Sequence, residues 1–280
     1  MQKIYVGVNG TPREVVKVLV GVNGTPREVT QVYVGSNGTP RLSYQNKTKA
    51  GEKVFTSSGK FTVPKGIDKI DIFCVGGGAD GSSGSIFNST GGDGGGSGYT
   101  KTVISASVAP GQVLSVAVGS SSGNTSVGQI CTAAGGSSEN GGSGGGAFGN
   151  FSAHQSIASA PGNGGSNGSN GGNSWKLNHS SVSSFGGKGQ GTTTRYFGES
   201  NGTLYAGGGG GGSGTIGSYA GYGGSGGGGN GAAAGLWGSA NPGTYGTGSG
   251  GGGGSGHAAA SSSGGSGGAG VAIIRWPDEA

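Results

Sequence analysis

The chain has 280 residues, and 76 of them are glycine. Only nine glycines lie in residues 1–75, so the other 67 make up about one in three of residues 76–280, against a usual share of about 7%. A collagen triple helix is excluded because the strict glycine period and the abundant proline of collagen are absent. The net charge of +5 divides into +6 for residues 1–75 (11 − 5) and −1 for the rest (5 − 6), which argues against a nucleic-acid-binding role for the glycine-rich part.

The N-terminus is a repeat with a period of 14 residues, in which residues 3–15 return as 17–29 and more loosely as 31–43. Each copy holds a strand of alternating apolar residues, an Asn-Gly pair and a second short strand. Asn-Gly is typical of a type I′ turn, so each copy is predicted to form a β-hairpin. A 14-residue unit cannot bury an apolar face alone. We therefore expect residues 1–43 to attach the protein to a partner or to extend it.

A polar linker is predicted over residues 44–53, followed by a glycine-rich domain over 54–280. Strands are expected at about 54–56, 61–64, 67–75, 99–108, 113–118 and 270–276. The chain leaves this set of strands and returns to complete it about 140 residues later. This pattern predicts a β-sandwich frame, formed by residues 54–135 and 264–277, with a large insert at 136–263.

Glycine runs alternate with loops that contain more residues of other types. The runs lie at about 91–98, 141–146, 162–172, 186–191, 206–214, 221–231, 246–256 and 264–270. One interpretation is a flexible linker. The other is a bundle of extended left-handed helices of the polyproline II type, which only glycine lets approach closely. We favour the bundle because linkers do not recur in similar lengths between aromatic loops. The predicted fold is thus mainly β with essentially no α-helix.

Little in the sequence points to catalysis or to a cofactor. Three histidines (His154, His179 and His257) lie in three different loops without acidic or cysteine neighbours, so we expect no metal site. The segment 186–191 lacks the Lys-Ser/Thr pair of a phosphate-binding loop. No carboxylate pair or nucleophile elbow is found, so we expect no enzymatic activity. The two cysteines, Cys74 and Cys131, are expected to be buried, and the sequence leaves open whether they pair.

Two framing segments carry a resemblance to a known family. The segment 61–78 (FTVPKGIDKIDIFCVGGG) and the closing segment 267–276 (GGAGVAIIRW) resemble the glycine-rich domain of phage tail proteins, over about residues 54–277. The N-terminal repeat is similar to repeats of tail and baseplate-associated proteins. The glycine bundle resembles that of tail-fibre tip adhesins, whose loops contact a bacterial surface receptor. The resemblance implies a virion protein, made in the host cytoplasm without a signal peptide.

The loops of the insert contain aromatic and basic residues that suit binding, because aromatic side chains give a large contact area at low rotamer cost. The predicted receptor-binding residues are Phe148, Phe151, His154, Trp175, Lys176, His179, Arg195, Tyr196, Phe197, Tyr219, Tyr222, Trp237 and Tyr245. The competing interpretation is that these rings pack over the bundle as lids.

We therefore expect a non-enzymatic adhesin that binds a polysaccharide or protein on the bacterial surface and other tail proteins through residues 1–43, without membrane insertion. The alternatives are a structural tail or baseplate component that does not bind the host, and a bacterial surface protein. A homotrimeric fibre and a monomeric tip both fit.

Overall fold

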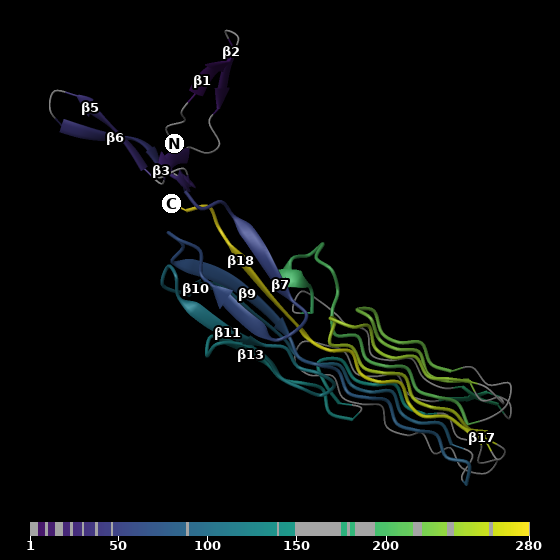
Figure 1. Ribbon diagram of the computed structural model, residues 1–280. Helices are drawn as coiled ribbons and strands as arrows, with labels where there is room; N and C mark the ends of the chain where they lie inside the picture. The colour runs from purple at the N-terminus through teal and green to yellow at the C-terminus, as the bar shows by residue number, and fades with distance from the viewer. Residues whose placement is uncertain are drawn as a thin grey trace.

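The fold is mainly β, as predicted. The computed structural model describes residues 5–8, 11–14, 19–22, 25–29, 31–36, 39–45, 47–87, 90–138, 140–148, 175–177, 180–182, 194–214, 220–233, 238–257 and 260–279. Among these residues the only helical element is a single 3-10 turn, η1 (Tyr196–Gly198). Figure 1 shows three parts in succession: the N-terminal hairpins, a pair of sheets, and a bundle of extended runs.

Three hairpins form the N-terminal part, and each joins two strands around an Asn-Gly pair. Their last paired residues face each other across that pair, with Val8 opposite Thr11 in the first hairpin. The strands are β1 (Tyr5–Val8) with β2 (Thr11–Glu14), β3 (Leu19–Val22) with β4 (Thr25–Glu28), and β5 (Gln31–Ser36) with β6 (Thr39–Gln45). Strand β6 ends at Gln45 and β7 begins at Gly51, so strands extend into both ends of the predicted linker.

Two four-stranded antiparallel sheets form the β-sandwich. The first sheet has the order β10-β9-β18-β7, and the second has the order β13-β12-β11-β8. The closing strand β18 lies between β9 and β7, so the predicted return of the chain to its first strands is confirmed. The strands of the first sheet are β7 (Gly51–Phe55), β9 (Lys69–Val75), β10 (Thr100–Ser107) and β18 (Val271–Trp276). Those of the second are β8 (Gly59–Thr62), β11 (Val113–Ala117), β12 (Thr125–Val127) and β13 (Cys131–Ala133).

The first sheet is buried on both faces along its two inner strands, where residues 72–75 of β9 and 271–274 of β18 are continuous buried apolar runs rather than alternating ones. Alternate residues of β9, such as Ile70, Ile72 and Cys74, face the second sheet and form the larger core. The intervening Phe73 and Val75 lie in a second core on the opposite face. Segment 194–206 covers that face as a third layer.

The glycine runs are hydrogen-bonded with a period of three residues, which is the period of a polyglycine helix. In run 248–256, adjacent N–H groups donate to different neighbouring runs, and N–H groups three residues apart donate to the same run. The donor–acceptor pairs are Gly250–Gly207 and Gly253–Gly210, Gly251–Ala79 and Gly254–Ser82, and Gly252–Asn241. The predicted bundle of left-handed extended helices is therefore confirmed.

Run 248–256 lies at the centre of the bundle. Its carbonyl groups accept hydrogen bonds from three further runs, again with a period of three. The donors are Gly98, Gly95 and Gly92 from one run, Gly268 and Gly265 from a second, and Gly229 and Ala232 from a third. The central run thus bonds to six surrounding segments, and main-chain hydrogen bonds take the place of a side-chain core.

Glycine is required where two runs approach too closely for a Cβ atom to fit between them. A Cβ atom on Gly250 would collide with the carbonyl oxygen of Gly95, and one on Gly253 with that of Gly92. Both Cβ–oxygen distances would be shorter than 3.0 Å, and Cβ atoms in proteins essentially never make contacts that short. The glycine content of the sequence follows from this packing.

Two details of the bundle differ from the prediction. The run predicted at 221–231 is divided by a turn at residues 225–227, where Gly226 and Gly227 have positive φ angles of 99° and 104°. The bundle also includes residues 76–85, for which the sequence pattern predicted no glycine run. Ala79 N–H, for example, donates to Gly96 O at 2.8 Å.

The bundle extends away from the sandwich, and we call its far end the distal end. Run 76–85 leaves β9 and run 90–98 returns to β10, so the turn between them lies at the distal end. The short hairpin of β16 (Gly256–His257) and β17 (Ala260–Ser261) lies at the same end (Figure 1). Nine residues at about 3.1 Å each place this end roughly 28 Å from the sheet.

Candidate functional site

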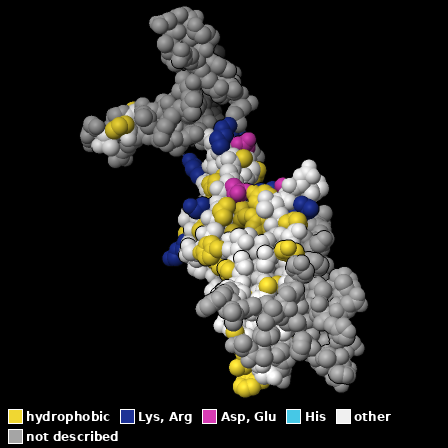
Figure 2. All heavy atoms as spheres, turned by 90° about the vertical axis from the view of Figure 1, so that its right-hand side faces the viewer, with side chains coloured by type: hydrophobic (Ala, Val, Ile, Leu, Met, Phe, Trp, Pro, Cys, Tyr) yellow, Lys and Arg dark blue, Asp and Glu magenta, His cyan; other side chains and the backbone are white. Residues whose placement is uncertain are grey.

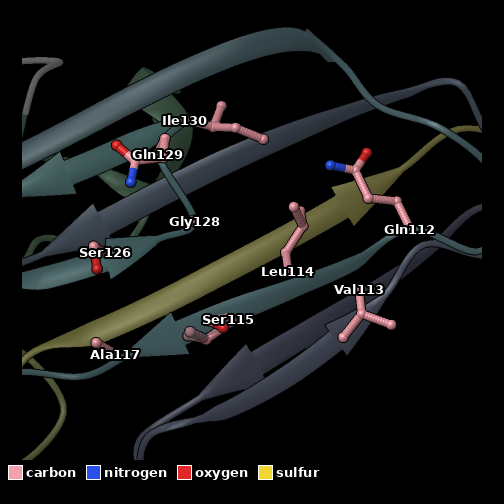
Figure 3. A pocket seen from close by; sticks show the side chains of 10 residues that line it. Gln112, Val113, Leu114, Ser115, Ala117, Ser126, Gly128, Gln129 and Ile130 are labelled. Carbon is pink, nitrogen blue, oxygen red and sulfur yellow. The ribbon is translucent and has the colours of Figure 1, made fainter.

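A groove lies on the second sheet, where β12 is shorter than its neighbour β11. Because β12 pairs with β11 only at Val116 and Ala117, residues 113–115 of β11 extend beyond it. The groove has a volume of about 510 Å³, and Figure 3 shows the side chains around it. Its lining consists of Gln112, Val113, Leu114, Ser115, Val116, Ala117, Ser126, Gly128, Gln129 and Ile130. These residues are uncharged and include no histidine or cysteine, so the groove offers contact surface rather than acid–base groups.

A smaller hollow of about 280 Å³ surrounds Arg275 on β18. The Arg275 Nε atom donates to Asp71 Oδ2 at 3.0 Å, and Nη1 donates to Glu199 Oε1. Its guanidinium carbon lies 4.0 Å from the centre of the Phe197 ring. Burial lowers the pKa of Arg275, but the hydrogen bonds and charges of Glu199 and Asp71 outweigh it and raise the pKa above its ordinary value. This cluster joins segment 194–206 to the sheet.

Three predicted binding residues lie in that covering segment, close to the sandwich. Phe197 is 6% exposed, and its ring centre lies 5.8 Å from that of Phe73. Tyr196 is half-buried beside the same ring, and Arg195 Nη1 donates to Gly202 O at 2.8 Å. These side chains hold the third layer in place, and the distal end lies far from them.

Tyr205 belongs to the same layer, with its ring centre 5.2 Å from that of Phe73. Burial, together with the charge of Glu52, raises the pKa of Tyr205 above its ordinary value of 10.0. Below pH 10 the hydroxyl is neutral in the folded and unfolded chains, and the stabilisation is fully present. As the pH rises from 10 towards the higher folded pKa, only the unfolded chain ionises, and stability is lost.

We therefore expect the free energy of unfolding to fall above pH 10, by at most about 1.4 kcal/mol per pH unit from this group. The variant Tyr205→Phe should show a shallower fall, because it has no hydroxyl to ionise. Urea unfolding between pH 8 and 11.5 measures both slopes. Equal slopes in the two proteins would contradict this role of Tyr205.

The other described binding candidates are dispersed over the bundle. Tyr245 lies beside the sandwich, where its hydroxyl donates to Thr56 O at 2.7 Å, and Tyr222 is exposed on the side of run 220–224. Phe148 lies towards the distal end, where its N–H donates to Asp93 Oδ1 at 3.0 Å. Trp175 and Lys176 lie on β14 (Trp175–Leu177), which pairs with β15 (Ser180–Val182), and only their backbone is described. The remaining candidates lie outside the described residues: Phe151, His154, His179, Tyr219 and Trp237.

An exposed apolar pair, Ile86 and Phe87, occupies the turn at the distal end; we call it the distal apolar turn. Phe87 is 92% exposed and Ile86 is 40% exposed. The turn is closed by a bridge between Ser85 and Thr90. Figure 2 shows hydrophobic side chains at this end of the molecule, whereas the visible lysines and arginines surround the sandwich and the linker.

Sequence reasoning missed the distal apolar turn because no glycine run was predicted before residue 91. A usable signal was present: Ile86 and Phe87 are the only large apolar residues between the glycines of 76–84 and those of 91–98. If glycine runs and turns alternate from Gly76 onwards, this pair falls in the turn between the first two runs.

The glycine runs that the structure describes are almost without charge. Their two charged side chains, Asp80 and Asp93, each accept a hydrogen bond from a backbone N–H, from Gly267 and Phe148 respectively. The described residues contain no group of three or more His, Cys, Asp or Glu side chains arranged to hold a metal ion. Within the same residues, no helix has the length and apolarity that crossing a membrane requires.

The glycine-rich domain family matches residues 55–277. This match begins at Phe55, the last residue of β7, and ends directly after β18, so it covers most of the sandwich and the whole bundle and leaves out the N-terminal hairpins. No curated protein matches the chain significantly. Since the family covers 223 of the 280 residues, the chain belongs to the glycine-rich domain family.

Proposed function

We propose that this protein is a non-enzymatic adhesin of a phage tail fibre or tail tip, and that the distal end of its bundle binds a receptor on the bacterial surface. The observation that carries the proposal is the 92% exposure of Phe87 on a turn held by the hydrogen-bonded glycine runs. Aromatic anchors of this kind dominate the binding energy of many interfaces. The resemblance to phage tail proteins supplies the biological setting.

The bundle suits such a role because it holds Ile86 and Phe87 at the end of a bonded run. Run 76–85 is bonded to neighbouring runs through its backbone, so this end is in place before it meets a partner. A side chain on a preordered support loses less entropy on binding than one on a free loop does. Burying one large apolar side chain contributes about 1.5–3 kcal/mol, which is weak alone and becomes effective when several copies bind together.

In this proposal the two ends of the molecule have different roles, attachment at the N-terminal hairpins and receptor binding at the distal end. The N-terminal hairpins lie beyond the sandwich, on the side opposite the bundle (Figure 1). Residues 1–43 would join the protein to other tail proteins, while the distal end faces outward. The structural tail component is the alternative, in which the distal apolar turn docks on another virion protein.

A binding assay with a matched control tests the proposal. Labelled protein is titrated on a panel of bacterial strains, alongside the double variant Ile86→Ser, Phe87→Ser and the control variant Ile104→Ser. Ile104 is 55% exposed on β10, at the sandwich end. We expect the double variant to bind a responsive strain at least about tenfold more weakly, a change of about 1.4 kcal/mol or more. The control should bind as the unaltered protein does.

Equal binding by the double variant would remove the distal apolar turn from the receptor site. Failure of the unaltered protein to bind any strain would favour the structural tail component. In that case, capture of tail proteins by the distal end becomes the relevant assay.

A further inference from the structure

The two cysteines face each other from the two sheets of the sandwich. Cys74 is on the inner strand β9 of the first sheet, and Cys131 is the first residue of the edge strand β13 in the second. Both thiols are free, and both are buried in the same core cluster. Neither residue takes part in the surface proposed above.

The sheets converge at this point. The N–H of Tyr99, directly before β10, donates to the carbonyl oxygen of Ala134, directly after β13, at 2.9 Å. Lys101 is the cross-strand partner of Cys74, and the sulfur of Cys131 lies 3.7 Å from the carbonyl oxygen of Lys101. Strands β9 and β13 are in contact at this point, and each thiol is close enough to change the pKa of the other, so the two side chains adjoin across the sheets.

We propose that Cys74 and Cys131 are a modification site, at which an inter-sheet disulfide forms when the protein meets a small-molecule disulfide in an oxidising environment. A protein thiolate attacks one sulfur of that disulfide and releases its first thiol. The second protein thiol then attacks the mixed disulfide and releases the other thiol. The protein gives up two electrons and two protons, and the small-molecule disulfide becomes two thiols.

Position in the sheets makes Cys131 the attacking thiol. Strand β13 has three residues, lies at a sheet edge and pairs only with β12 in its sheet, whereas β9 is held on both sides by β10 and β18. Local opening therefore exposes Cys131 before Cys74. The neighbouring Cys131 thiol and burial raise the pKa of Cys74, whereas the neighbouring Cys74 thiol lowers the pKa of Cys131, so thiolate is favoured on the thiol that local opening exposes first.

The disulfide would close a loop from residue 74 to residue 131 and join the two sheets. A cross-link over a loop of this length restricts the unfolded chain and stabilises the fold. From the usual size of that effect we expect the Tm of the oxidised protein to lie about 5–15 °C above that of the reduced protein.

The test is equilibration of the purified full-length protein in glutathione buffers from fully reduced to fully oxidised, followed by alkylation and intact-mass measurement. We expect loss of about 2 Da, for two hydrogens, in a monomeric chain, with no glutathione retained and reversal by dithiothreitol. Urea below the unfolding transition should accelerate the reaction, since opening limits access. Two alkylated thiols, a stable glutathione adduct or a disulfide between chains under oxidising conditions would overturn the proposal.

Single variants provide the control. Cys74→Ala and Cys131→Ala should each lose the oxidation-dependent rise in Tm while keeping the Tm of the reduced protein within a few degrees; if either fails to fold, the serine variant replaces it. Cys74→Ala should trap glutathione on Cys131 several-fold faster than Cys131→Ala traps it on Cys74. A rise in Tm on oxidation of either variant would show that the stabilisation has another source, and equal trapping rates would overturn the assignment of Cys131 as the attacking thiol.

Discussion

Replacing Gly251 with alanine is expected to unfold the glycine bundle, at a cost above about 4–5 kcal/mol. A Cβ atom at this position would collide with the carbonyl oxygen of Gly265, which is backbone and cannot turn aside. The added methyl group would push apart runs joined by the bonds from Gly251 N–H to Ala79 O (3.0 Å) and from Gly95 N–H to Gly251 O (2.8 Å). Alanine tolerates the extended left-handed backbone itself, so the cost comes from packing alone.

The measurement is urea unfolding together with limited proteolysis, with Gly59→Ala as the control. Gly59 lies on β8, and the nearest atom to an added Cβ belongs to the Phe55 ring, at 3.6 Å, which is ordinary contact. The control should change the free energy of unfolding by no more than about 0.5 kcal/mol. A Gly251→Ala protein as stable as the control would show that the runs are not packed this closely.

Replacing Phe73 with alanine is expected to cost about 3–5 kcal/mol and to release the third layer from the sheet. The ring is fully buried and contacts Tyr196, Phe197 and Tyr205 at centre-to-centre distances of 6.3, 5.8 and 5.2 Å. Its removal leaves a cavity under segment 194–206. Urea unfolding gives the loss of stability, and amide hydrogen exchange in residues 194–206 reports the release.

The same substitution at Phe87 is the matched control, because that ring is 92% exposed. Phe87→Ala should leave the free energy of unfolding within about 0.5 kcal/mol of the unaltered value. Similar losses from both variants would mean that Phe73 contributes through something other than burial. Unchanged exchange in residues 194–206 of Phe73→Ala would show that other contacts, such as the Arg275–Glu199 ion pair, hold the layer.

Much of the frame could be predicted from local patterns. The hairpins follow from alternating residues around Asn-Gly, which encode both strand and turn within 14 residues. Strands β9 and β18 are apolar runs long enough to be recognised, and the return of the chain to β18 follows from their shared need for burial. The period of the glycine bundle follows from the stereochemistry of glycine alone.

What could not be predicted depends on contacts between distant residues. Tyr196 and Phe197 have polar neighbours in the sequence, which suggests an exposed loop, yet they cover the sheet. The sequence does indicate that this face of the sheet must be covered, because a two-layer sandwich would expose the apolar residues Phe73, Val75, Val271 and Ile273. It does not indicate which segment covers them. Nor does it indicate which glycine runs lie next to each other, because all runs have nearly the same composition.

The three-residue period restricts how the bundle can vary in length. Each residue of a run bonds to a partner fixed by its place in the period, as Gly250 and Gly253 do with the run containing Gly207 and Gly210. Adding three residues to a run lengthens it by one turn and keeps every partner, provided its neighbours lengthen with it. Adding one or two residues instead rotates the rest of the run by about 120° or 240° and misdirects its hydrogen bonds. Length changes in the runs are thus confined to steps of three, while the turns between them can change freely.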